Sequence, residues 1–109
     1  MADVQGKFQL GDLFDYFYAY TAALDLGNAA TGSGTFASSD VTVPGVALGD
    51  VVLSVSLAVD TVDTAVVAAV TAANTVTVTV LNNTAGAVNL ASATVRLLIA
   101  RPNSTVFRV

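Results

Sequence analysis

Apolar and polar residues alternate with a period of two over much of the chain. The clearest case is TVTVTVL at 75–81, where threonine and valine take turns up to an asparagine-rich stretch. Successive side chains of a β-strand point to opposite sides, so strict alternation predicts a strand with one buried face. We expect Val76, Val78 and Val80 to face the core, and the threonines between them to face water or a partner.

Three further segments predict strands of the same kind. TAALDLG at 21–27 and TFASSDVTV at 35–43 precede the valine–threonine segment, and ATVRLLIAR at 93–101 follows it. The last segment alternates again. Its residues expected to face the core are Val95, Leu97 and Ile99.

Two segments in the middle of the chain differ in how many of their faces are apolar. VVLSVSLAV at 51–59 predicts a half-buried strand. Its expected inward residues are Leu53, Val55, Leu57 and Val59. AVVAAVTA at 65–72 is apolar on both faces, which predicts a strand that is central in its sheet or contacts a partner.

Turn-forming residues separate the predicted strands. Pro44-Gly45 suits the centre of a type II turn, a second turn follows at Leu48-Gly49-Asp50, and Asn74 tolerates the positive φ of a short connection. Short strands at a spacing of about 8–12 residues are typical of sandwiches and barrels. The sequence therefore predicts an all-β fold: a single β-sandwich of jelly-roll or Greek-key type with about six to eight strands.

The N-terminus has a different composition, because it holds six of the eight aromatic residues. They are Phe8, Phe14, Tyr16, Phe17, Tyr18 and Tyr20. A helix capped by Asp12 and an extended arm are both compatible with this stretch, and we favour the extended arm. We expect an N-terminal arm at 1–20, a β-sandwich domain at 21–102 and a C-terminal tail at 103–109. The aromatic residues either pack within the monomer or anchor the arm to a neighbouring subunit or another protein.

Charge and hydropathy exclude several classes of partner. The formal net charge is −4, all eight acidic residues are aspartates, and only Lys7, Arg96, Arg101 and Arg108 are basic. Nucleic-acid binding needs clustered cations, so no nucleic-acid partner is expected. The stretch at 64–95 is uncharged and long enough to span a bilayer, but its period of two and its asparagines argue against a membrane helix.

The residue set offers little for catalysis. The chain has no histidine and no cysteine, so a nucleophilic serine or threonine would have no ordinary base and a metal would have no thiolate ligand. The pairs Asp12–Asp15 and Asp60–Asp63 are better explained as turn and cap residues than as acid–base or cation sites. We expect no enzyme activity, no catalytic residue, no metal site and no cofactor.

Several motifs resemble those of a known family. Five motifs follow one another along the chain: VTVPG from Val41 to Gly45, LGD at 48–50, the hairpin at 70–78, NNTAGAV at 82–88 and LAS at 90–92. Together with the closing strand that carries Arg96, they resemble the small β-sandwich proteins of tailed bacteriophage virions. The resemblance covers about residues 21–101, and Ala85 and Ala93 replace glycines that the group often has.

The resemblance implies a structural role. It implies a capsid decoration, or cement, protein that binds the outer surface of the phage head and stabilises the mature capsid across capsomer boundaries. The implied partners are the major capsid protein and other copies of the chain in a homotrimer, and the implied location is the virion. The alternative is a tail-fibre or receptor-binding module. For the decoration role we expect the six aromatic residues of the arm to be the partner-binding anchors; for the receptor-binding alternative the loops would be the site.

Overall fold

The computed structural model describes residues 13–25, 28–29, 35–61, 63–84, 86 and 88–103. This part of the chain is all-β, as the alternating pattern predicted. Its strands are β1 (Phe14–Leu24), β2 (Asn28–Ala29), β3 (Thr35–Thr42), β4 (Val51–Leu57), β5 (Ala65–Ala72), β6 (Thr75–Asn82), β7 (Val88–Asn89) and β8 (Ala93–Pro102). The described residues include no helix long and apolar enough to cross a membrane.

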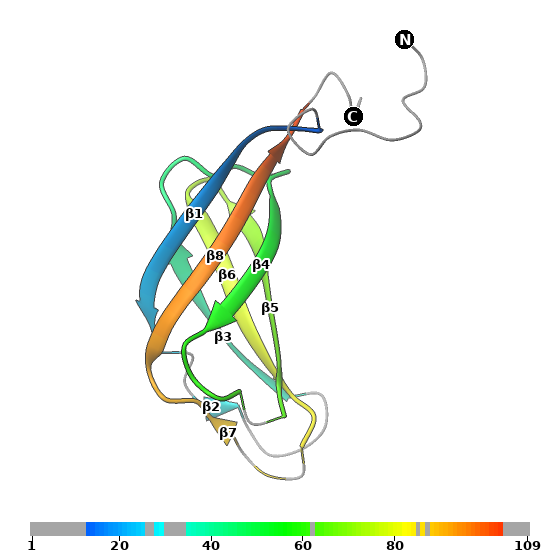
Figure 1. The fold of residues 1–109 in the computed structure, drawn as a ribbon. Coiled ribbons are helices and arrows are strands. Elements are labelled where there is room, and N and C mark those ends of the chain that lie inside the picture. Colours follow the sequence, from blue (N-terminus) through cyan, green and yellow to red (C-terminus); the bar gives the residue numbers. More distant parts are fainter. Residues whose placement is uncertain are drawn as a thin grey trace.

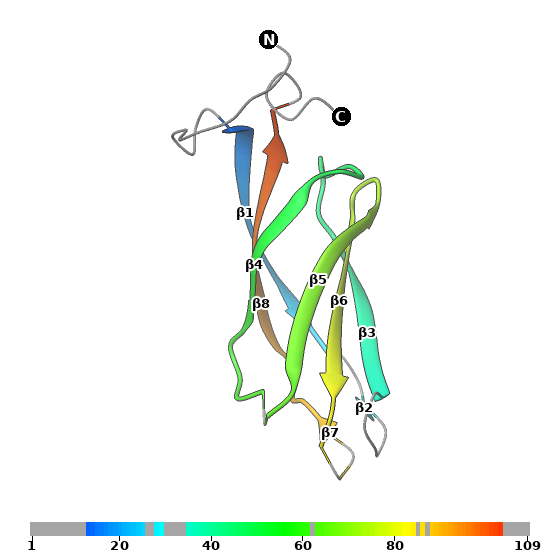
Figure 2. The same cartoon turned by 90° about the vertical axis from the view of Figure 1, so that its right-hand side faces the viewer.

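The six longer strands form two antiparallel sheets. One sheet has the order β1-β8-β4 and the other has the order β3-β6-β5, while β2 and β7 pair separately. Figure 1 looks onto the first sheet, and Figure 2 shows the two sheets from the side, with their inner faces toward each other. The arrangement is sandwich-like, and each sheet has one inner and one outer face.

The two central strands supply most of the core. Side chains directed inward are almost fully buried in both strands. They are Val76, Val78 and Val80 of β6 and Val95, Leu97 and Ile99 of β8. The inward direction predicted for both sets is confirmed. Small, β-branched side chains suit this position because they pack well on the pleated surface of a strand.

The expected arm is partly a strand of the first sheet. β1 begins at Phe14 and pairs along its length with β8, so the boundary expected after residue 20 falls inside this strand. The extended reading is confirmed for residues 14–24 and the helical reading is wrong there, because the backbone donors and acceptors of β1 pair with β8. Tyr18 and Tyr20 pack against the core, as does Leu24. Residues 1–12 and 104–109 lie outside the described part of the chain.

β4 departs from the predicted alternation. Its pairing with β8 is irregular between Val52 and Ser54, which marks a β-bulge. An extra residue in one strand shifts the alternation of faces on either side of it. Val52 and Val55 therefore pack against the core, whereas Leu53 is 42% exposed. The expectation that Leu53 faces inward is wrong for this reason.

β5 is an edge strand, although both of its faces are apolar. It pairs with β6 on one side only and lies beside β4 of the other sheet. Val66 and Val70 pack against the core, and Val67 is 48% exposed on the outer face. The prediction of a central strand is wrong, because the topology gives that place to β6. Contact with a partner stays a prediction.

Candidate interaction surface

The turn motifs meet at one end of the molecule. Gly45 and Gly49 both have positive φ, of 97° and 99°, and Asn74 has a φ of 61° in the β5–β6 turn. Asn74 holds the neighbouring loop in place, because its side-chain oxygen accepts a hydrogen bond from the Gly45 N–H at 2.9 Å. Its own N–H donates to the carbonyl of Val46 at 2.8 Å. The β3–β4 loop is thus fastened to the β5–β6 turn.

An ion pair joins the same loop to β8. The carboxylate of Asp50 accepts hydrogen bonds from Nε and Nη2 of Arg101, each at 2.9 Å. A bidentate pair of this kind has a defined geometry as well as charge. The Ala47 N–H also donates to Asp50, at 3.0 Å. The Asp50 side chain is only 3% exposed, so its charge depends on these donors.

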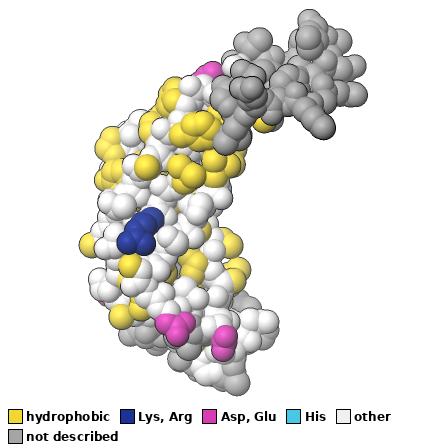
Figure 3. All heavy atoms as spheres, viewed as in Figure 1, with side chains coloured by type: hydrophobic (Ala, Val, Ile, Leu, Met, Phe, Trp, Pro, Cys, Tyr) yellow, Lys and Arg dark blue, Asp and Glu magenta, His cyan; other side chains and the backbone are white. Residues whose placement is uncertain are grey.

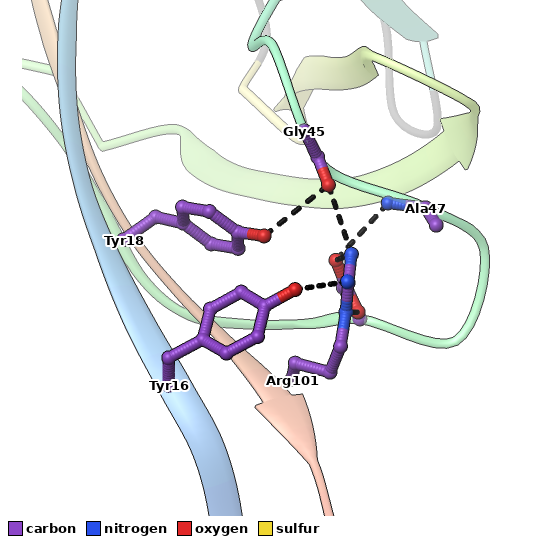
Figure 4. Close-up of polar contacts among 6 residues, drawn as sticks. Tyr16, Tyr18, Gly45, Ala47 and Arg101 are labelled. Atoms are coloured by element: carbon purple, nitrogen blue, oxygen red, sulfur yellow. Dashed lines mark hydrogen bonds and ion pairs between the residues drawn. The ribbon is translucent and has the colours of Figure 1, made fainter.

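Two tyrosines of β1 complete this loop cluster, which we define as Tyr16, Tyr18, Gly45, Asp50 and Arg101 (Figure 4). The Gly45 carbonyl accepts from Tyr18 at 3.2 Å and from Nη2 of Arg101 at 2.8 Å. Nη1 of Arg101 donates to the hydroxyl of Tyr16, and its guanidinium carbon lies 4.9 Å from the centre of that ring. The two tyrosine rings meet edge to face with centroids 5.0 Å apart.

The charged groups of the loop cluster stabilise each other. The hydrogen bonds from Arg101 hold the pKa of Asp50 below its ordinary value, and Asp50 in turn raises the pKa of Arg101. Both groups are therefore charged at neutral pH. Among the described residues, no buried side-chain nitrogen or oxygen lacks a partner. The polar groups of the loop cluster hold one another in place, which is what positions the β3–β4 loop.

The outer face of the β1-β8-β4 sheet, here called the β8 face, carries an apolar patch (Figure 3). Four large side chains make up this patch and are about equally exposed. They are Phe17 at 41%, Val51 at 40%, Leu53 at 42% and Leu98 at 39%. Figure 3 shows hydrophobic side chains gathered over the upper half of this face and one basic side chain below them. Large exposed apolar patches mark interaction sites.

The register arranges this patch in rows across the strands. Phe17 pairs with Ala100, and Ala100 pairs with Val51, so these three side chains share one row of the β8 face. The next row contains Ala19, Leu98 and Ser54. The row after that contains Arg96, paired with Thr21 and Ser56. The row of Arg96 therefore follows one apolar row and one row in which Ser54 is the polar side chain.

The outer face of the β3-β6-β5 sheet, here called the β6 face, has a second apolar region. Phe36 is 63% exposed and Leu81 is 39% exposed, and they pair across β3 and β6. Val67 of β5 lies in the neighbouring row with Thr79. The outward threonines of β6 are half-buried, as part of a sheet surface with small polar side chains. Both outer faces of the molecule thus expose large apolar side chains.

The expected anchors fall into three groups. Phe17 lies on the β8 face, and the ring of Phe14 is 5.4 Å from it. Tyr16 and Tyr18 belong to the loop cluster, and Tyr18 and Tyr20 pack against the core. The sixth expected anchor, Phe8, lies outside the described residues. The five aromatic residues that the structure describes do not form one surface.

Asp12 of the first aspartate pair lies outside the described residues. No three aspartates within residues 13–25, 28–29, 35–61, 63–84, 86 and 88–103 come close enough together to hold a metal ion. Asp63, one member of the pair at 60 and 63, has a φ of 61° in the connection between β4 and β5. Aspartate tolerates this conformation better than most residues, which agrees with a role in the turn.

The sequence pattern did not predict the ion pair of the loop cluster or the exposed apolar residues of the β8 face. Asp50 and Arg101 were noted as a turn residue and a strand residue, 51 positions apart, and nothing in the alternation pairs them. For Leu98 a signal did exist, because LLIA in the last strand is apolar on both faces. Comparisons of the chain with protein-family models, with curated proteins and with solved structures found no match.

Proposed function

We propose that this protein is a capsid decoration protein that binds the outside of a bacteriophage head and stabilises the mature shell. The observation that carries the proposal is the exposure of large apolar side chains on both outer faces of a small all-β molecule. A decoration protein contacts the shell and neighbouring copies of itself, and two apolar faces supply the two contacts. The motif resemblance at about 21–101 points to the same class of virion protein.

The strand order supports a β-sandwich of Greek-key type, which belongs to this proposal. β4, β5 and β6 are consecutive among the six longer strands, and β8 returns to pair with β4. β4 and β5 lie side by side where the two sheets meet. The resulting order β8-β4-β5-β6 is the order of a Greek key.

Stabilisation of the shell follows from selective binding. A protein that binds only the assembled, expanded shell shifts the equilibrium toward that state by mass action. Rigid sheets suit this role, since side chains already held in place lose little conformational entropy on binding. We assign the shell contact to the β6 face, where Phe36, at 63%, is the most exposed aromatic side chain of the described residues.

Immunogold labelling of intact virions of the phage that encodes the chain tests the proposal. We expect label over the head and none at the tail. Label at the tail tip would replace this proposal with the alternative of a receptor-binding module of a tail fibre. Absence of label from virions would refute both.

Co-sedimentation with heads that lack the protein tests the assignment of the β6 face. The substitution Phe36→Ser removes an exposed aromatic anchor, and we expect it to weaken binding by about tenfold or more. Ser38→Ala on the same strand and face is the matched control and should bind as the natural protein does. Equal binding of the Phe36→Ser protein would contradict the assignment.

A further inference from the structure

The edge strands of the two longer sheets differ in how their edges are protected. β4 and β5 lie beside each other, and each pairs irregularly with its neighbour in its own sheet. β3 carries an exposed charge, Asp40, in its second half. Bulges and charged side chains of this kind keep an edge strand from pairing with another chain. The fourth edge strand, β1, has neither feature between Tyr16 and Leu24.

β1 therefore offers a long and regular edge. It pairs with β8 without irregularity from Tyr16 to Leu24, and this stretch contains no charged residue, glycine or proline. Among the described residues, no strand pairs with the other side of β1, here called the β1 edge, and Figure 1 shows β1 as the outermost strand of its sheet. In an antiparallel ladder, alternate residues direct their N–H and C=O groups to opposite sides of the strand. About half of the backbone donors and acceptors of β1 therefore lie along this edge, where an added strand would bind them.

A second copy of β1 can supply the added strand. A two-fold axis perpendicular to the sheet, through the middle residue Ala19 of Phe14–Leu24, overlaps the two strands over their whole length. The strands then run antiparallel, and each residue lies opposite one that points to the same face. The outer faces of the two sheets become continuous, and both inner faces stay on the core side.

This register brings together side chains that suit cross-strand pairs. Phe17 of one copy lies opposite Thr21 of the other on the outer face, and Tyr18 lies opposite Tyr20 on the inner face. The two-fold axis repeats each pair, and aromatic–β-branched and aromatic–aromatic pairs stabilise antiparallel sheets. A two-fold axis along the strands would pair them in parallel, which is slightly less stable, and would turn the outer face of one copy to the core side of the other.

We propose that the β1 edge joins two copies of the chain in a homodimer, with β1 antiparallel to β1 about a two-fold axis at Ala19. Two three-stranded sheets become one sheet of order β4-β8-β1-β1-β8-β4. A two-fold contact closes at two copies, so this assembly differs from the homotrimer that the family resemblance implies. Pairing at an edge covers neither outer face, which leaves the β6 face free for the proposed shell contact.

Light scattering of the purified protein gives the first test. A contact through one strand edge is small, so we expect a weak dimer whose mass approaches twice the 11.0 kDa of the chain as the concentration rises. A mass of one chain at every concentration, or a mass of three chains, would overturn the proposal. The measurement needs no phage head, so its result is independent of the proposed capsid function.

A matched pair of lysine substitutions gives the second test. Ala19 and Ser38 are both exposed, and each lies on an edge strand of its own sheet. Ala19→Lys places two positive charges directly opposite each other and should weaken the dimer about tenfold or more, with the circular dichroism of the fold retained. Ser38→Lys should dimerise as the natural protein does. Unchanged dimerisation of the Ala19→Lys protein, or weaker dimerisation of the Ser38→Lys protein, would refute the assignment to the β1 edge.

A mixture of two variants tests the position of the axis. Ala19→Lys and Ala19→Asp each oppose like charges when alone, whereas a mixed dimer opposes lysine to aspartate, provided that position 19 meets itself. We expect each variant alone to be mainly monomeric. The equimolar mixture should form a dimer with a dissociation constant within about threefold of the natural value. A mixture that stays monomeric would overturn the proposed axis.

Discussion

The loop cluster and the β8 face use the same pair of strands, β1 and β8, in opposite ways. Tyr16 and Arg101 are paired in the ladder and bring polar groups into the loop cluster. One row away, Phe17 and Ala100 are paired and direct apolar groups outward. In the loop cluster the polar groups have partners within the chain, whereas on the β8 face the apolar groups are exposed.

This difference separates residues that build the fold from residues that are available for binding. A buried charge without a partner is strongly destabilising, so the interactions of Asp50 are needed before the loop can form. An exposed apolar side chain destabilises the isolated molecule little. Its burial free energy becomes available when another surface covers it. Substitutions in the loop cluster should therefore change stability, and substitutions on the β8 face should change association.

The largest expected difference is between neighbouring residues of β8. Ile99 has no exposed surface, and Ile99→Ala should lower the free energy of unfolding by about 3–4 kcal/mol because it leaves a cavity. Leu98→Ala removes an outward side chain and should cost the monomer less than about 1 kcal/mol. Urea denaturation at a concentration low enough to keep the protein monomeric measures both. Equal losses would mean that the two faces of β8 are equally buried.

The next effect concerns the ion pair of the loop cluster. Asp50→Ala removes the acceptor of Arg101 and of the Ala47 N–H, and should lower the free energy of unfolding by about 2 kcal/mol. Asp40→Ala is the matched control, because Asp40 is an exposed aspartate that accepts from Thr77. It should cost less than about 1 kcal/mol in the same measurement. A larger effect at Asp40 would contradict the structural role of the loop cluster.

Acid should remove part of the same stabilisation. The hydrogen bonds from Arg101 lower the pKa of Asp50 in the folded protein, whereas the unfolded value is about 3.8. The unfolded state therefore binds the proton more readily, and the stabilisation by Asp50 is complete above the unfolded pKa and is lost as the pH falls through the folded pKa. Thermal melts from neutral pH to below pH ~3 should show the natural protein converging on Asp50→Ala. A constant difference would refute this linkage.

The smallest effects concern the two glycines of the β3–β4 loop. Both have positive φ, so Gly45→Ala and Gly49→Ala should each cost about 1 kcal/mol from backbone strain. A new Cβ at Gly45 would lie 3.7 Å from the Tyr18 ring, whereas one at Gly49 would meet nothing within 4 Å. The carbonyl of Gly45 also accepts two hydrogen bonds of the loop cluster. Gly45→Ala should therefore have the lower melting temperature of the two, and the reverse order would contradict this.

The alternation of side chains was a reliable guide where pairing is regular. It placed the inward valines of β6 and the inward residues of β8 correctly, since a strand has a fixed period of two. It failed at Leu53 because a bulge adds a residue to one strand without a clear signal in the sequence. It also failed for β5, since apolar residues on both faces do not distinguish a central strand from an edge strand that lies against another sheet.

Local sequence was enough to predict the all-β class, the turn positions and the inward faces of the regular strands, because these depend on the backbone and on residues close in the chain. The identity of neighbouring strands emerged only in the folded molecule, since pairing depends on contacts between distant segments. That pairing brought Arg101 to Asp50 across 51 positions and placed Phe17, Leu98 and Val51 on one face. Both candidate surfaces are products of strand order, which local periodicity does not encode.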